Sequence, residues 1–553
     1  MRRNVDDQAS ESAGLWPPGT VRLEKLHGSD EAELILQPRP SRDPNDPLKW
    51  PEWRKYLNFG LVIFYVAMVA EFINAATPTW DPMNEELGYS FELLNDSYAA
   101  GCASLAVGSL LLIPFALKFG RRPMYLFSTA LQFGLGIWSA RMQTAADLML
   151  INVLQCFFGS LAEVIVQMTI ADVFFVHQRG RMNAIYVWVW LLASYLGILI
   201  AGFIAKRQGW RWIWWWNAII FGVSMVAFFF AYEETKYSPP EPISTPSLET
   251  TTATATGNTE HTDKETISKA TICGSQITAH SPEDGIDHAI PRKTYFQRLA
   301  ITTTTTSATS STTTFLKHMY QPLVLLGTVP AIAYASLVYG VLVGLGDVMS
   351  TMLSTFLTKA PYDFTSDQIG LMSLPRMIGV TIGFLIIGPI SDWWIVFLSR
   401  RRGGIYEPET RLWCAVPFLL FVPVGALMFG IGLSNHLRWP IIAVGLALYN
   451  VGVTPINSIV ITYLTDSYTD IIGPALVAVT VVRNTFSTIF IFALTPWIAK
   501  VGIKWVLVTI LLIAGLILAL FGVFIRYGKY FRERSAKSYQ YYANRQYKER
   551  VDK

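Results

Sequence analysis

Long apolar runs dominate this sequence and restrict it to folds that sit in a bilayer. Each run is close to the roughly 20 residues that an α-helix needs to cross the hydrocarbon core of a membrane. Only 15% of the residues are charged, against about 25% in soluble domains, and 52% are hydrophobic. In lipid a spanning segment must satisfy its own backbone polar groups, which favours helices for runs of this length. We therefore predict an all-α membrane protein with twelve transmembrane helices, at about 56–76, 95–117, 123–141, 147–174, 184–205, 211–232, 322–345, 367–390, 411–433, 438–463, 473–497 and 503–526.

A long polar segment divides these spans into two sets of six. Residues 233–318 are rich in Thr and Ser and contain too few apolar residues to bury a core. We expect this linker to be a disordered spacer, and whether it is phosphorylated stays open. The predicted regions are a disordered N-terminal tail at 1–55, a six-helix half at 56–232, the linker at 233–318, a second six-helix half at 319–527 and a C-terminal tail at 528–553.

Basic residues gather on one side of the predicted membrane. If the helices alternate in direction, most Lys and Arg residues near the span ends face one compartment, and Lys206, Arg207 and Arg211 face the other. The positive-inside rule then places both termini and the linker in the cytoplasm. The first 50 residues have no apolar core of a signal peptide, so we expect the first span to direct insertion. The predicted location is the plasma membrane, with the vacuolar membrane as the alternative.

Two short loops at matching depth in the two sets of spans suggest an internal repeat. The first, after the second span, is Gly120-Arg121-Arg122, and the second is the Gly388-to-Asp392 turn that closes the eighth span. Repeats of this kind build transporters from two pseudo-symmetric halves. An acid at a helix end beside a basic loop forms a latch that breaks when the halves move, although any cytoplasmic loop can collect arginines. The gating-loop candidates are Gly120, Arg121, Arg122, Gly388, Asp392 and Arg400.

The arrangement resembles the major facilitator superfamily over all twelve spans. The loop signature of that family, G-x-x-x-D-x-x-G-R-R, keeps its Gly-Arg-Arg end here, but Ile113 and Leu117 replace its first Gly and its Asp. The loss of the acid at Leu117 weakens the latch in the first half and favours Asp392 in the second. The segments DPNDPLKWPEWRKY and ISDWW…RRRGGIYEPETRL resemble fungal multidrug, polyamine and histidinol permease-type members of the proton-antiporter branch.

The resemblance implies two six-helix halves that rock around a cavity at mid-membrane in a monomer without a cofactor. Two departures from the family pattern bear on its mechanism. Gln155 stands where proton-coupled members carry an Arg in the fourth helix, and the 194–202 run in the fifth helix has glycines but no proline. Neither proton coupling nor export is therefore fixed by these motifs.

Ionisable residues inside spans are rare because lipid makes them costly, so each is a functional candidate. Glu71 lies about 22 Å along the first span, and Glu163 lies deep in the fourth. In the family that this chain resembles, both helices line the central cavity. Each carboxyl group could carry a proton or hold a cationic substrate. The alternative is that each forms an ion pair with an arginine for structure alone.

The second half supplies bases within two spans. Arg376 lies in the eighth span and Arg483 near the middle of the eleventh. Each could pair with an acid, such as Asp347 beyond the seventh span, or bind an anionic substrate group, and we favour pairing or gating. Three amides could donate hydrogen bonds in the cavity or simply join helices: Asn450, Asn457 and Asn484.

Several classes of function have no support in the sequence. It contains no phosphate-binding lysine loop, no nucleophile–base arrangement and no His/Cys cluster with metal-ligand spacing, and its net charge of +4 indicates no nucleic-acid partner. We predict a non-enzymatic, proton-coupled secondary transporter that moves a small organic molecule by alternating access. Export of a drug-like compound or secondary metabolite is preferred. Uptake of cationic nutrients such as polyamines and nutrient sensing are the alternatives, and substrate and direction stay open.

Overall fold

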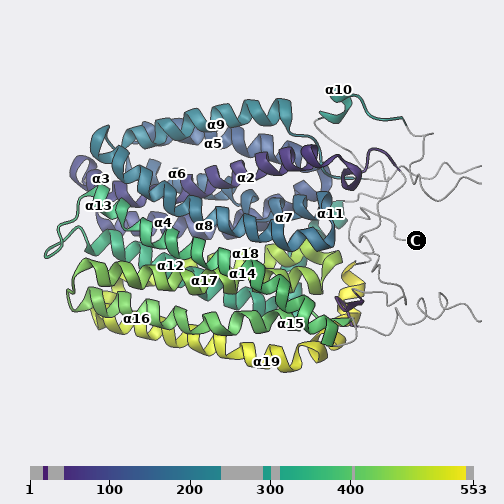
Figure 1. Ribbon diagram of the computed structural model, residues 1–553. Helices are drawn as coiled ribbons and strands as arrows, with labels where there is room; N and C mark the ends of the chain where they lie inside the picture. Colours follow the sequence, from purple (N-terminus) through teal and green to yellow (C-terminus); the bar gives the residue numbers. More distant parts are fainter. Residues whose placement is uncertain (1–16, 23–42, 238–290, 301–311, 402–404, 544–553) are drawn as a thin grey trace, which may run out of the picture.

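The computed structural model describes residues 17–22, 43–237, 291–300, 312–401 and 405–543. Long helices run side by side across the molecule, with the first half of the chain above the second in Figure 1. Helices α3 and α13 lie at one end of this bundle, which we call the α3–α13 end. The opposite end, where α2 begins and α9 ends, is called the basic end, because Arg54, Arg121 and Arg122 lie there.

The first half contains the six predicted spans. The fourth span consists of two helices, because a turn at Ser160 separates them. The helices of this half are α2 (Glu52–Asn74), α3 (Trp80–Leu87), α4 (Phe91–Phe119), α5 (Arg122–Ala140), α6 (Ala145–Gly159), α7 (Leu161–Val173), α8 (Val176–Arg207) and α9 (Arg211–Ala231).

The second half also follows the predicted order, but its boundaries differ. The seventh span is formed by α11 and α12, which meet at Pro330, and α12 continues to Phe356. Asp347 is therefore inside a span, whereas we predicted it beyond one. The helices of this half are α11 (Thr312–Thr328), α12 (Pro330–Phe356), α13 (Ser366–Leu371), α14 (Ser373–Arg401), α15 (Glu409–Leu412), α16 (Phe421–Ser434), α17 (Trp439–Ser467), α18 (Ile472–Val501) and α19 (Ile503–Ala543).

Within the residues that the structure describes, eleven helical segments are long and apolar enough to cross a membrane, so the predicted all-helical membrane fold is confirmed. The predicted span at 123–141 forms α5, which is not among the eleven. Its buried face carries polar residues, including Ser128, Thr129 and Gln132, and these lower its mean hydropathy. The count of twelve is thus close.

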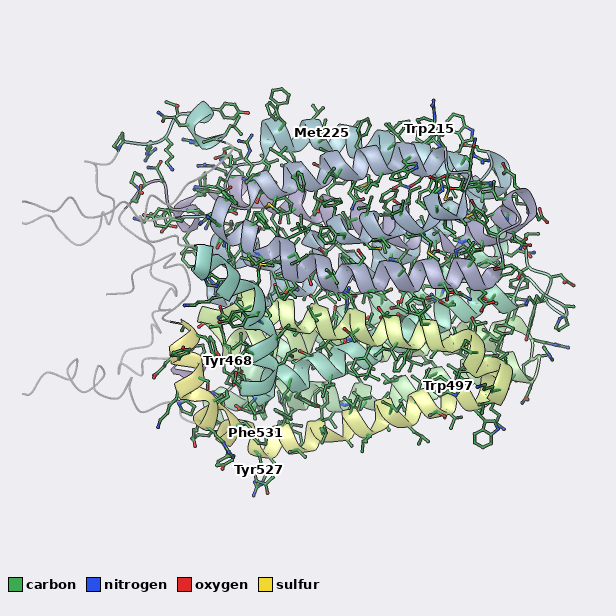
Figure 2. The ribbon with its side chains drawn as sticks, turned by 180° about the vertical axis from the view of Figure 1, so that it is seen from behind. Trp215, Met225, Tyr468, Trp497, Tyr527 and Phe531 are labelled. Atoms are coloured by element: carbon green, nitrogen blue, oxygen red, sulfur yellow. The ribbon has the colours of Figure 1, made fainter. Side chains whose placement is uncertain are left out.

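Both predicted tails are ordered where they meet the bundle. Before α2, Asp46 caps a short 3₁₀ helix, η1 (Pro47–Lys49), and Leu48 and Trp50 are buried. Helix α19 runs on to Ala543, well past the predicted end of the last span, and Figure 2 shows Tyr527 pointing away from the bundle there. Polar composition was a poor guide at these edges, because packing against the helices orders the adjoining chain.

The linker lies mostly outside the described residues. Its first residues, 233–237, form no helix or strand and pack against the basic end of the bundle, where Thr235 and Lys236 are buried. Near its end, α10 (Tyr295–Arg298) forms one helical turn, and α11 begins at Thr312. Our prediction of disorder across 233–318 was therefore wrong at the edges that the structure describes.

The N-terminal segment also reaches the second half. Strand β1 (Val21–Arg22) pairs antiparallel with β2 (Ile405–Tyr406), which follows α14. Nearby, Arg532 donates to the hydroxyl oxygen of Thr20 at 3.1 Å. A segment that precedes the first half in the chain thus contacts the basic end of the second half.

The most extensive contacts between the halves involve α4 and α8 of the first half. Helix α4 packs along α18, and α8 packs against both α13 and α14. The two halves approach closely at Gly202, where a Cβ atom would meet the carbonyl oxygen of Ser366 at 2.5 Å. At the same end, Lys206 pairs with Asp367 at 2.8 Å. The halves are therefore closed against each other at the α3–α13 end.

Candidate functional site

A buried ion pair joins the two halves in the middle of the bundle. Arg483, on α18, donates through Nη2 to Oε1 of Glu163, on α7, and only 8% and 1% of these side chains are exposed. Asn484 completes the group: its Nδ2 donates to Oε2 of Glu163 at 3.2 Å, and its Oδ1 accepts from Nη2 of Arg483 at 3.0 Å. Three of the predicted site residues thus form one hydrogen-bonded unit across the interface.

The local structure around this pair suits opposite charges. The break at Ser160 starts a new helix, so Glu163 lies in the first turn of α7. The dipole of a helix favours a negative charge in its first turn. Two aromatic rings enclose the partner, because Trp190 and Tyr339 each have their ring centre 5.8 Å from the guanidinium carbon of Arg483. Such contacts stabilise a cation that has lost its water.

A second polar group lies around Arg376 on α14. Its Nη1 donates to Oγ of Ser350 on α12 at 2.6 Å. The ring of Tyr195, from α8 in the first half, is 5.4 Å from its guanidinium carbon, and the Tyr195 hydroxyl donates to Oδ1 of Asn450 at 2.9 Å. Arg376 and Asn450 were both predicted, and the structure brings them together at the interface between the halves.

Asp347 is the acid of this second group. Its Oδ2 accepts a hydrogen bond from Oγ of Ser487 on α18 at 2.6 Å. Ser350, which holds Arg376, follows one turn later on the same helix, so the acid and the base lie on one side of α12. Sequence reasoning missed the importance of Asp347 because it ended the seventh span too early.

Glu71 lies apart from both groups. It is in the last turn of α2, and its Oε1 accepts from Nδ2 of Asn217 at 3.1 Å. Gly197 of α8 packs so closely on it that a Cβ atom there would meet the Glu71 side chain. In the part of the chain that the structure describes, no cation pairs with Glu71. This site belongs to the first half alone, whereas we predicted a shared cavity with Glu163.

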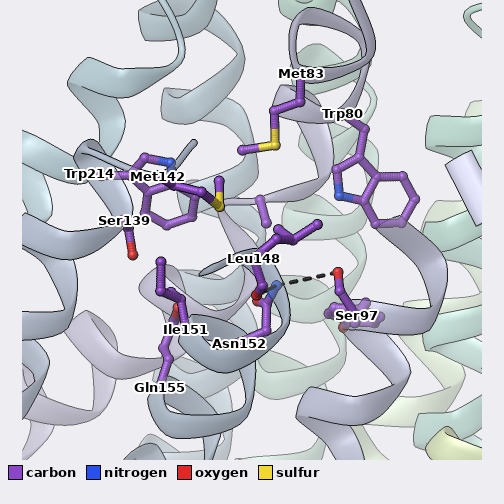
Figure 3. Close-up of a pocket in the computed structure, with 12 residues that line it drawn as sticks. Trp80, Met83, Ser97, Ser139, Met142, Leu148, Ile151, Asn152, Gln155 and Trp214 are labelled. Atoms are coloured by element: carbon purple, nitrogen blue, oxygen red, sulfur yellow. Dashed lines mark hydrogen bonds between the residues drawn. The ribbon is translucent and has the colours of Figure 1, made fainter. Parts of the chain in front are cut away.

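The remaining predicted amide, Asn457, is buried in α17, and neither atom of its amide group has a hydrogen-bond partner among the described residues. Gln155, which we compared with the family's helix-four arginine, donates to the carbonyl oxygen of Phe72 at 2.7 Å. It also lines a small cavity within the first half, shown in Figure 3, where Asn152 donates to the hydroxyl oxygen of Ser97 at 3.3 Å. That cavity is separate from the Glu163 group, since no carboxylate, Lys or Arg lines it.

The first predicted gating loop is held by two acids that sequence reasoning did not assign. Gly120 has φ of +108°, which suits a residue without a side chain. Glu234, from the segment after α9, accepts from the backbone N–H groups of Arg121 and Arg122 at 2.9 and 3.0 Å. Asp172, at the end of α7, pairs with the Arg121 guanidinium at 3.0 Å. The acid missing at position 117 is thus replaced by acids from α7 and from the segment after α9, so the loop is anchored.

The second predicted gating loop is not a loop where we placed it. Gly388 lies inside α14, which continues without interruption to Arg401. The side chains of Asp392 and Arg400 lie outside the described part of the structure. At the same end, Glu409 accepts two hydrogen bonds from Arg532, at 2.7 and 2.6 Å. Gly-Pro pairs favour turns, but here the apolar sequence on both sides of the pair continues as one helix.

Two sets of membrane-crossing helices, joined at their interface by buried opposite charges, define a transporter built from two halves. The chain belongs to the Major Facilitator Superfamily, whose family model matches residues 57–486. The protein is therefore a membrane transporter and not an enzyme.

Relatives and a solved structure agree with this assignment. The Uncharacterized MFS-type transporter C1271.10c of Schizosaccharomyces pombe is 30% identical, covering 95% of this chain and 94% of that protein. Protein HOL1 of Saccharomyces cerevisiae is 29% identical over 85% of each chain. Probable efflux pump mfs2 of Aspergillus flavus is 25% identical, covering 75% of this chain and 88% of that one. The proton:xylose symporter XylE shares the fold with a TM-score of 0.57 at 12% identity, over 86% of this chain and 97% of XylE.

Proposed function

We propose that this protein is a proton-coupled secondary transporter that exports a small drug-like compound or secondary metabolite. The observation that carries the proposal is the buried unit of Glu163, Arg483 and Asn484 between the halves. A charged pair that links two moving bodies must be broken or exchanged whenever they separate. Protonation of Glu163 removes its charge, weakens its hold on Arg483 and allows the halves to part.

The contacts around this unit fit alternating access. At the α3–α13 end, the Lys206–Asp367 pair and the close approach at Gly202 keep the halves together. These contacts lie between the halves and not within either one, so rocking can open them without unfolding a half. Export is preferred because relatives of this chain include proteins described as efflux pumps.

We also infer that the basic end faces the cytoplasm and that the plasma membrane is the location, with the vacuolar membrane as the alternative. Arg54, Arg122, Lys529 and Arg532 lie at this end, which is the arrangement that the positive-inside rule describes. A monomer suffices for the proposed mechanism, because both halves belong to one chain.

The direct test is dye export from a host cell whose own multidrug exporters have been removed. We expect the protein to lower the retention of rhodamine 6G or Nile red several-fold, and a protonophore to abolish this effect. Glu163→Gln should abolish it as well, whereas Glu85→Gln, at an exposed acid of α3, should not. Purified protein in vesicles should respond likewise to an imposed pH gradient. Solute movement that ignores the gradient would refute proton coupling.

Uptake of a cationic nutrient is a second candidate, favoured by Glu71. Its carboxyl group accepts a hydrogen bond from the Asn217 amide and, within the described residues, pairs with no cation. Its negative charge could therefore bind a positively charged solute. Spermidine uptake that rises with expression and falls in Glu71→Gln would support this candidate over export. Unchanged spermidine uptake in cells that express the protein would remove it.

A further inference from the structure

An acid and a base lie near each other at the interface between the halves without forming an ion pair. Asp347 lies one turn before Ser350 on α12, and Ser350 binds Arg376, yet Arg376 and Asp347 form no ion pair with each other among the described residues. Each is held by a different serine, Arg376 by Ser350 and Asp347 by Ser487, at 2.6 Å in both cases. Two opposite charges in a membrane interior gain most by pairing, because water does not screen them there. Their separation therefore requires an explanation.

The guanidinium of Arg376 has unused hydrogen-bonding capacity. Only 2% of the residue is exposed, and its Nε and Nη2 atoms are buried without a partner among the described residues. Leaving a buried charged donor unsatisfied costs about 1–3 kcal/mol or more. Nε and Nη2 form one edge of the guanidinium, and an arginine edge binds a carboxylate through two parallel hydrogen bonds. The side chain thus presents a vacant edge suited to an oxyanion.

The surroundings belong to both halves of the transporter. Tyr195 comes from the first half, and its ring lies 5.4 Å from the guanidinium carbon of Arg376, which comes from the second. The same tyrosine donates to Asn450 of the second half at 2.9 Å. A molecule bound at Arg376 would therefore lie where the halves meet, and it would affect how they move against each other.

We propose that Arg376 and Asp347 form a binding site for an amphoteric small molecule, with its carboxylate on the Nε–Nη2 edge of Arg376 and its ammonium group at Asp347. A plain anion would leave the Asp347 charge without a partner, and a polyamine would meet the positive charge of Arg376. A zwitterion satisfies both residues and brings no net charge into the membrane. This inference rests on the proposed transport function and names the substrate class of that function.

The first test uses matched ligands on the purified wild-type protein in detergent. Each set is one scaffold in three forms: L-phenylalanine, L-phenylalaninamide, which lacks the carboxylate, and N-acetyl-L-phenylalanine, which lacks the ammonium group. Equivalent sets from tryptophan and histidine vary the size of the side chain. We expect the zwitterion of at least one set to bind about tenfold more tightly than both partners. Equal binding of the three forms, or no binding in any set, would overturn the proposal.

The second test assigns the two charges to the two residues. Arg376→Gln should remove the preference for the acid over the amide. Arg376→Lys should lose most of that preference, because lysine lacks the two parallel N–H donors of the guanidinium. Asp347→Asn should remove the preference for the free amine over the acetylated form. The matched controls are Arg141→Gln and Glu85→Gln, at exposed positions, and they should keep both preferences. Preferences that survive in Arg376→Gln and Asp347→Asn would also overturn the proposal.

The alternative is that the two side chains simply pair with each other in another conformation. In that case each single substitution should lower the melting temperature and the Arg376→Gln/Asp347→Asn double variant should recover it. We expect no such recovery. If the single variants do not fold, the ligand sets on the wild type still decide the question.

Failure of the site and failure of the transport function have different signatures. Collapse of the pH gradient by a protonophore should stop movement in vesicles, whereas the ligand preferences of the purified protein do not depend on a gradient. Zwitterion binding without any movement under a gradient would refute the transport proposal and leave the site intact. Gradient-driven movement of the zwitterions of these sets that is unaffected by Arg376→Gln would refute the site and leave the transport proposal intact.

Discussion

Glu163 and Arg483 are the residues whose partnership the structure defines most sharply. Breaking a buried ion pair by removing one charge leaves the other without compensation, at a cost of about 3–5 kcal/mol, whereas replacing both by apolar residues restores much of the stability. We expect Glu163→Leu to destabilise the protein strongly and Glu163→Leu/Arg483→Met to recover most of the loss. Thermal unfolding of the purified variants in detergent measures both effects.

The control for these Glu163 and Arg483 variants is an exposed ion pair between the same two halves. Lys206, which pairs with Asp367, is 53% exposed, and surface pairs of this kind contribute about 0–1 kcal/mol. Lys206→Met should therefore change the melting temperature little. A Glu163→Leu protein as stable as Lys206→Met would contradict the structural weight that we give to the buried pair.

The sequence was informative about single residues and uninformative about their partners. Glu163, Arg483 and Asn484 were all identified because charged and polar groups in apolar runs are conspicuous. Their pairing was not, since Glu163 and Arg483 are 320 residues apart and no local pattern links them. Asp347 was misplaced for a related reason: the apolar run before it is shorter than the helix that contains it.

At the scale of elements, the loop between α4 and α5 shows how a degraded motif can keep its structure. A Cβ atom at Gly120 would collide with the Glu234 carboxylate, and φ of +108° strains any other residue. Gly120→Ala should therefore displace Glu234 from the backbone N–H groups of Arg121 and Arg122 and lower the melting temperature.

Gly134 of α5 provides the matched control. A Cβ atom there would meet nothing within 4 Å, and alanine is favoured over glycine in a helix by about 0.5–1 kcal/mol. We expect Gly134→Ala to be neutral or slightly stabilising. Equal melting temperatures for Gly120→Ala and Gly134→Ala would show that the loop tolerates a side chain and is not anchored by Glu234.

The sequence predicts well which segments form helices, but it predicts poorly where those helices begin and end. Apolar runs identified every long helix, because burying a helix in lipid depends mainly on composition. The ends depend on contacts that composition does not reveal. Helix α14 continues through Gly388 and Pro389, where the sequence stays apolar, and α19 continues to Ala543. The two-part fourth span was also missed, although its break at Ser160 is what gives Glu163 a helix N-terminus.

At the scale of the whole molecule, the halves meet through separate contacts at different depths. The Lys206–Asp367 pair and the Gly202 approach lie at the α3–α13 end, and the Glu163 unit lies deeper in the bundle. A transporter that rocks about its centre must open the contacts at the α3–α13 end in each cycle. The pair formed by Lys206 and Asp367 is therefore a position where a covalent link should stop transport without touching the central groups.

We expect Lys206→Cys/Asp367→Cys to lose transport when a short bifunctional thiol reagent joins the two cysteines, and to regain it when the link is reduced. Cys102, Cys156 and Cys414 are buried and should not react, and a Cys273→Ser background removes the fourth native thiol. Each single cysteine variant with the same reagent is the control and should keep its transport. The readout is dye export before treatment, after linking and after reduction. Full transport in the linked protein would mean that the halves do not separate at the α3–α13 end, which would refute alternating access by rocking.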